Sequence, residues 1–89
     1  MNAPAHLDVT TLDALKLGRR AENVSIDWAA LPSADANRLR HFGFDEGVKV
    51  EALHLGPFGR DPLAVRVGRM TVAIRRAHAA AVRVLPAAA

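Results

Sequence analysis

Hydrophobic and polar residues alternate along the second half of the chain, as is typical of strands with one buried face. The clearest segment is 63–74, where a two-residue turn at Gly68-Arg69 would join two strands into a hairpin. This register pairs apolar residues only: Leu63 with Ile74, Val65 with Val72, and Val67 with Met70. A slip of one residue would no longer keep the apolar side chains on one face of the hairpin. The pattern therefore predicts this register, with a type II′ turn.

Three further segments read as strands. In 19–27, Val24 and Ile26 alternate with polar residues, which predicts a half-buried strand. From residue 48 the apolar positions alternate and then change phase near Ala52, which predicts a bulge or a strong bend. Val82 and Val84 flank Arg83 and predict a last short strand.

One helix is expected at about 34–42, with Ser33 as its N-cap. Gly43 should end it in the left-handed conformation. Counting back from that glycine, Leu39 and Phe44 take the two positions that make the hydrophobic contact of a Schellman stop.

These elements describe a small all-β protein, a five-stranded barrel with one short helix inserted between its first two strands. Residues 10–18 (TTLDALKLG) add one helical turn that ends at a glycine. We expect a single domain at 10–85, a flexible leader at 1–9 and a disordered tail at 86–89.

Composition removes several classes of protein. The 89 residues contain no cysteine, so disulfides, thiolate metal sites and cysteine nucleophiles are excluded. No apolar run approaches the roughly 20 residues that span a bilayer, and the N-terminus lacks the pattern of a secretory signal. We therefore expect a cytoplasmic protein without membrane insertion.

Charge is unevenly distributed along the chain. Residues 1–59 carry six Lys/Arg and eight Asp/Glu, whereas residues 60–89 carry six Arg and one Asp. The basic part could face nucleic acid, anionic lipid or an acidic protein, or its arginines could simply solvate the outer faces of strands. Specific nucleic-acid binding is disfavoured because stacking aromatics are not interleaved with these arginines.

Catalytic chemistry has no visible basis in the sequence. The glycines form no phosphate-binding loop, and neither Ser25 nor Ser33 sits in a nucleophile elbow. We therefore do not expect an enzyme or a required cofactor.

Metal binding stays open. The four histidines show no HxH, HxxxH or HExxH spacing, and surface positions explain them well. A weakly bound divalent metal could still be gathered across space by His54 with Glu51 or Asp45.

The loop 56–62 (GPFGRDP) offers a candidate docking point for another protein. Phe58 lies between Pro57 and Gly59 and precedes Arg60. An exposed aromatic beside an arginine is a common interface pairing, although Phe58 could equally fold back over the barrel mouth.

Taken in order, three segments resemble the FeoA family of ferrous iron transport proteins: TLDALKLGRRAENVSI, RLRHFGFDEGVKVEAL and GPFGRDPLAVRVGRMTVAIRRAHAAAVRV. The resemblance covers roughly residues 10–85. The family commonly has Leu at the position of Phe58 and Leu-Gly-Leu at Phe42-Gly43-Phe44, and residues 28–35 lack its usual glycine-rich or acidic turn.

This resemblance implies an SH3-like barrel and a cytoplasmic accessory role in bacterial Fe²⁺ uptake, at the inner membrane through the permease FeoB. FeoB's cytoplasmic GTPase domain is the expected partner, and the family supplies no catalytic residues to carry over. Two alternatives remain: a direct Fe²⁺ or Zn²⁺ carrier or sensor, and an SH3-like module that works with a metal-dependent repressor. Homo-oligomerisation also stays open.

Overall fold

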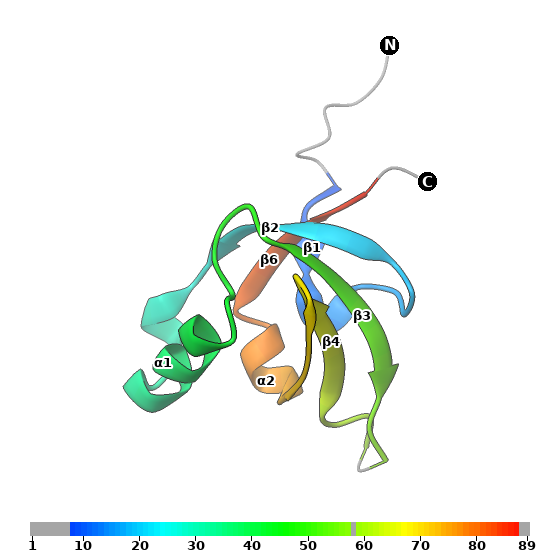
Figure 1. The fold of residues 1–89 in the computed structure, drawn as a ribbon. Coiled ribbons are helices and arrows are strands. Elements are labelled where there is room, and N and C mark those ends of the chain that lie inside the picture. Colours follow the sequence, from blue (N-terminus) through cyan, green and yellow to red (C-terminus); the bar gives the residue numbers. More distant parts are fainter. Residues whose placement is uncertain (1–7, 58, 88–89) are drawn as a thin grey trace.

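The computed structural model describes residues 8–57 and 59–87. Most of the expected leader, Phe58 and the last two residues of the expected tail lie outside these ranges. Within them the chain forms a small, mostly β domain whose sheet curls round one core (Figure 1).

A single antiparallel sheet contains six strands in the order β1-β6-β2-β3-β4-β5. The strands are β1 (Thr10–Thr11), β2 (Arg20–Ile26), β3 (Lys49–Leu55), β4 (Leu63–Val67), β5 (Met70–Ile74) and β6 (Val82–Pro86). The five longer strands are those expected from the sequence, and β1 is an added two-residue strand beside β6. The order leaves β1 and β5 at the two edges of the sheet.

Four short helical segments connect the strands (Figure 1). They are the 3₁₀ turns η2 (Leu12–Ala14) and η3 (Trp28–Ala30), and the helices α1 (Ser33–His41) and α2 (Arg76–Ala79). The sequence of 76–81 predicts only a short turn between the last two strands, and the structure forms helix α2 there. In the described part of the chain, no helix has the length and apolar character needed to cross a membrane.

The β4–β5 hairpin confirms the predicted register. Its pairs are Leu63 with Ile74, Val65 with Val72 and Val67 with Met70. Gly68 has φ of 57°, as the first central position of a type II′ turn requires. Five of the six apolar side chains are buried, and Met70 is half exposed because the hairpin extends beyond the core there.

Helix α1 ends as predicted but begins differently. Gly43 has φ of 92°, Phe44 N–H donates to the Leu39 carbonyl at 3.0 Å, and Gly43 N–H donates to the Arg40 carbonyl at 3.0 Å. These two bonds are those of a Schellman motif, and Leu39 and Phe44 are both buried. Ser33 is not the N-cap; it is the first helical residue, because the Pro32 carbonyl already accepts the first intrahelical bond.

Two bulges change the alternation of side chains. The predicted bulge in β3 is confirmed between Ala52 and His54, and Ala52 is fully buried. A second bulge in β2, between Asn23 and Ser25, was not predicted. It turns Val24 outward to 43% exposure and buries Asn23, so the expected inward position of Val24 is wrong.

Asn23 organises the turn that leads from α1 to β3. Its Nδ2 donates to the Asp45 carbonyl at 3.0 Å, its N–H donates to the Val48 carbonyl, and its own carbonyl accepts from Gly47 N–H. The side chain is 1% exposed, which makes it the buried polar residue of the described core. This network replaces the apolar contact that the sequence pattern suggested for β2.

The sheet also extends beyond the expected domain end. Pro86 pairs with Ala21, and Ala87 N–H donates to the Arg20 carbonyl at 2.9 Å. Arg19 donates two side-chain hydrogen bonds to the Ala87 carbonyl. Of the residues expected in a disordered tail, Pro86 is therefore the last residue of β6, and Ala87 is bonded to Arg20 just after it.

Candidate functional site

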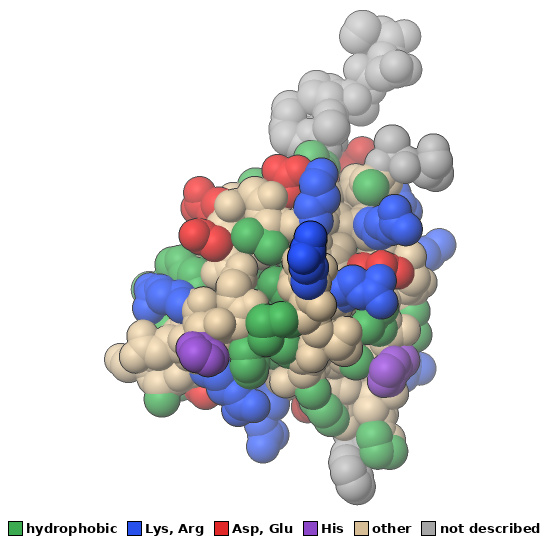
Figure 2. Space-filling model, viewed as in Figure 1, with side chains coloured by type: hydrophobic (Ala, Val, Ile, Leu, Met, Phe, Trp, Pro, Cys, Tyr) green, Lys and Arg blue, Asp and Glu red, His purple; other side chains and the backbone are tan. Residues whose placement is uncertain are grey.

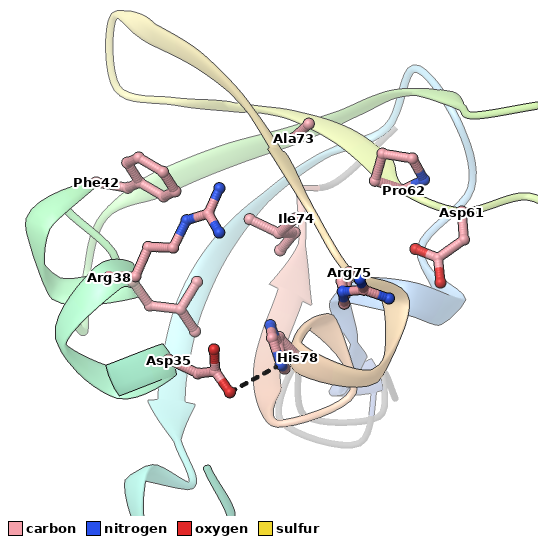
Figure 3. A pocket seen from close by; sticks show the side chains of 10 residues that line it. Asp35, Arg38, Phe42, Asp61, Pro62, Ala73, Ile74, Arg75 and His78 are labelled. Carbon is pink, nitrogen blue, oxygen red and sulfur yellow. Dashed lines mark ion pairs between the residues drawn. The ribbon is translucent and has the colours of Figure 1, made fainter. Parts of the chain in front are cut away.

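A hollow of the described surface lies between α1 and the end of β5, where the chain enters α2 (Figure 3). Its volume is about 540 Å³, within the range of roughly 300–1,000 Å³ typical of ligand pockets. The residues around it are Asp35, Arg38, Leu39, Phe42, Asp61, Pro62, Ala73, Ile74, Arg75 and His78. We refer to this hollow as the α1–β5 groove.

One ion pair crosses the groove between the two helices. His78 Nε2 of α2 lies 3.3 Å from Asp35 Oδ2 of α1, and both side chains are partly buried (Figure 3). The contact carries a full charge interaction only when the imidazole is protonated. It joins two elements that the sequence separates by more than forty residues, so spacing alone could not reveal it.

A second carboxylate of the groove is also engaged. Asp61 Oδ1 accepts a hydrogen bond from the backbone N–H of Arg76 at 3.0 Å, at the first residue of α2. A carboxylate in this position satisfies one of the donors that a helix start leaves unpaired. Asp61 therefore fixes α2 beside the groove.

The two arginines of the groove, by contrast, have no carboxylate partner among residues 8–57 and 59–87. Arg38 reaches from α1 toward β5, and its guanidinium carbon lies 5.5 Å from the centroid of the Phe42 ring (Figure 3). Arg75 follows the last residue of β5 and is exposed. Two cations without a carboxylate partner in this part of the chain, in a groove that the apolar Leu39 and Ile74 also line, suit a ligand that carries carboxylates or phosphates.

The predicted metal candidates do not come together in the structure. No group of three His, Cys, Asp or Glu side chains in the described ranges could hold a metal ion. Asp45 lies in the turn before β3, where its Oδ1 accepts from Glu46 N–H at 2.8 Å. Glu51 Oε1 lies 3.6 Å from Arg66 Nη1 and 4.0 Å from Arg20 Nε.

The β3 bulge nevertheless places Glu51 and His54 on one face of the sheet. Glu51 is opposite Arg66 and His54 is opposite Ala64, two positions that share a face of β4. These two side chains are the only part of the predicted metal set that the fold aligns. Whether they bind a metal stays a prediction.

The predicted docking loop lies between β3 and β4. Pro57 and Arg60 are exposed, and Arg60 has φ of 68°. Phe58, the residue on which that hypothesis chiefly depended, lies outside the described residues. Lysines and arginines spread over this view of the molecule rather than forming one patch, so the loop is not singled out by charge (Figure 2).

The α1–β5 groove was not predicted. Its charged residues come from α1, from the loop before β4 and from the end of β5 with α2. Each of them looks like an ordinary surface residue when the sequence is read locally. The confirmed β4–β5 hairpin and α1 stop could have located the two walls, but only the tertiary fold places them face to face.

Comparison with known proteins gives one family. The model of the FeoA domain matches residues 10–86. No functionally curated protein matches the chain.

Solved structures agree with that match. The solution structure of a FeoA protein from Chlorobium tepidum is 34% identical, with a TM-score of 0.77 over 89% of this chain and 71% of that one. A Stenotrophomonas maltophilia FeoA complexed with zinc, described as a procaryotic SH3 domain protein, is 37% identical. Its TM-score is 0.72, over 84% of this chain and 88% of that one.

A more distant likeness concerns the fold alone. IdeR of T. acidophilum is 16% identical, with a TM-score of 0.75 over 98% of this chain and 37% of that one. Together these neighbours confirm the predicted SH3-like β fold.

Proposed function

The chain belongs to the FeoA family, which is associated with ferrous iron transport, and from this premise we propose that it binds and regulates a FeoB-type iron permease through protein contacts. The docking target is the cytoplasmic GTPase domain of that permease. The protein then works in the cytoplasm and reaches the inner membrane only through its partner.

The observation that carries this proposal is the family match over residues 10–86, almost the whole chain. An accessory role by contact also suits the α1–β5 groove, which is lined by apolar residues and by two arginines that have no carboxylate partner within the described ranges. Arginine and aromatic side chains in a partly enclosed site are common anchors of protein interfaces. No reaction is needed to explain any of these features.

The test is a calorimetric titration of this protein with the purified GTPase domain, without nucleotide, with GDP and with a non-hydrolysable GTP analogue. We expect saturable binding in at least one of these states. Flat titrations in all three, with both proteins shown to be folded, would refute the proposal.

Direct metal binding is the second candidate, favoured by the shared face of Glu51 and His54 and by the zinc complex of the S. maltophilia relative. In this reading His54 and Glu51 would supply two donors, and water or a second molecule would complete the coordination. Titration with Zn²⁺ and, without oxygen, with Fe²⁺ tests it. Binding that is lost in His54→Ala but kept in His41→Ala supports a site, whereas unchanged binding in His54→Ala removes it.

A further inference from the structure

Strand β5 is an open edge of the sheet. It is last in the strand order and pairs only with β4 within the described residues. A two-residue turn makes Val67 and Met70 the closing hydrogen-bonded pair, so every second residue of β5 bonds to β4. The backbone groups of Thr71 and Ala73 must then point away from β4.

The neighbouring strand confirms this assignment. Gly68 N–H donates to the Lys49 carbonyl at 3.1 Å, so the even-numbered residues along β4 direct their backbone groups toward β3. The backbone N–H and C=O groups of its odd-numbered residues therefore point toward β5. Neither Thr71 nor Ala73 takes part in a backbone hydrogen bond with any other described element, and both residues are exposed.

This open edge runs into the α1–β5 groove. Ala73, Ile74 and Arg75 form the β5 side of the groove, and α1 forms the other (Figure 3). The carboxylates of Asp35 and Asp61 are already engaged by His78 and by the Arg76 N–H. The groove therefore combines unused backbone donors and acceptors with unused positive charge.

We propose that the α1–β5 groove binds an extended, acidic segment of a partner protein, which adds to β5 as a further strand. The segment's backbone would bond to Thr71 and Ala73, and its carboxylates would meet Arg38 and Arg75. The inference rests on the proposed function in one respect only, namely the identity of the partner protein that carries the segment. The chemistry of the site stands on the groove itself.

Two features favour this occupant over a second copy of the chain. Pairing two β5 edges would bring the arginines of both copies together, in a protein whose formal net charge is already +3. An acidic segment removes that repulsion and gains charge-assisted hydrogen bonds. The backbone of such a segment would also bond to the open edge of β5. An acidic extended segment would therefore use both the free backbone groups and the arginines of the groove.

The test is amide hydrogen exchange by NMR on the ¹⁵N-labelled protein, with a blocked nonapeptide that alternates Glu and Val as the probe. We expect exchange at Thr71 and Ala73 to slow by about tenfold or more, while Val72, already bonded to β4, changes little. The matched peptide with Lys for Glu should have no effect. Unchanged exchange at both residues, or concentration-dependent protection without any peptide, would overturn the inference.

Variants separate the two parts of the site. Ala73→Pro removes an N–H that β4 does not use, so it should block strand addition while the hairpin remains. Arg38→Glu with Arg75→Glu should weaken peptide binding by about tenfold or more, whereas Arg83→Glu on β6 makes the same kind of charge change outside the groove and should not. Equal binding by the double variant and by wild type would contradict the proposal, even if Ala73→Pro fails to fold.

The same variants distinguish this inference from the proposed function. If the permease domain binds wild type, Ala73→Pro and the double arginine variant equally, the groove assignment is wrong and the adaptor function stands. If the acidic peptide binds but the permease domain does not, the groove assignment stands and the proposed partner is wrong.

Discussion

Replacing Gly43 by alanine should destabilise the protein through backbone conformation alone. Gly43 has φ of 92°, and a Cβ added there would meet no heavy atom within 4 Å. The cost is therefore the penalty for a left-handed alanine, about 1–2 kcal/mol, which comes from crowding with its own backbone and not from contact with other parts of the fold. Gly43→Asn should cost less, because asparagine tolerates this conformation better.

Urea unfolding followed by circular dichroism measures this effect. We expect a lower midpoint in Gly43→Ala with an unchanged m-value, and an intermediate midpoint in Gly43→Asn. The Schellman stop fixes the direction in which the chain leaves α1. The NMR amide signals of the groove residues Arg38 and Phe42 should therefore also shift in the alanine variant. Equal stability of the glycine and alanine proteins would refute the account of how α1 ends.

Three other substitutions test separate parts of the fold by the same unfolding assay. Asn23→Ala should cost about 1–3 kcal/mol, because it removes the bond from Nδ2 and leaves the Asp45 carbonyl without that donor; a loss below about 0.5 kcal/mol would contradict the structural role of this residue. Gly56→Ala should destabilise by steric overlap, since its Cβ would lie 2.6 Å from the Asp61 carbonyl oxygen, and a neutral result would show that this loop adjusts freely. Arg66→Ala should change stability by less than about 1 kcal/mol, because the Arg66 side chain is more than half exposed and lies 3.6 Å from Glu51, and a larger loss would mean that the charges on this face act as a network.

Local chemistry made the hairpin and the helix stop predictable. In 63–74, the glycine-first turn and the apolar pairs demand one register, and any other would expose the hydrophobic face. At the end of α1, Gly43 and the Leu39–Phe44 contact are both set by residues within one turn of each other. The hairpin register and the helix stop both depend on residues that are close in sequence, so contacts with the rest of the fold have little effect on them.

The bulge of β2 could not be predicted in the same way. Val24 has the residue type of an inward position, and Asn23 does not. Their exchange depends on Asp45, Gly47 and Val48: the Asp45 carbonyl accepts from the Asn23 side chain, and the other two residues bond to the Asn23 backbone. That compensation comes from a turn more than twenty residues away, so it exists only after the strands have paired.

The candidate site could not be predicted from the sequence for the same reason, because it is formed by residues that are distant in sequence. Arg38 and Arg75 lie on separate elements, and nothing in their local sequence indicates that they share a groove. The family resemblance supplied the fold and the link to iron transport, but not this surface. The sequence hypothesis instead favoured Pro57, Phe58 and Arg60, whose exposure is visible locally as a glycine- and proline-rich loop.

The central claim is that this protein acts by contact with the permease. Its most direct test is to add the unlabelled GTPase domain to the ¹⁵N-labelled protein and to follow the amide signals of the whole chain at saturation. The account predicts that signals of β5 and α1 change while those of β6 do not. A spectrum that stays unaltered in every nucleotide state would contradict it.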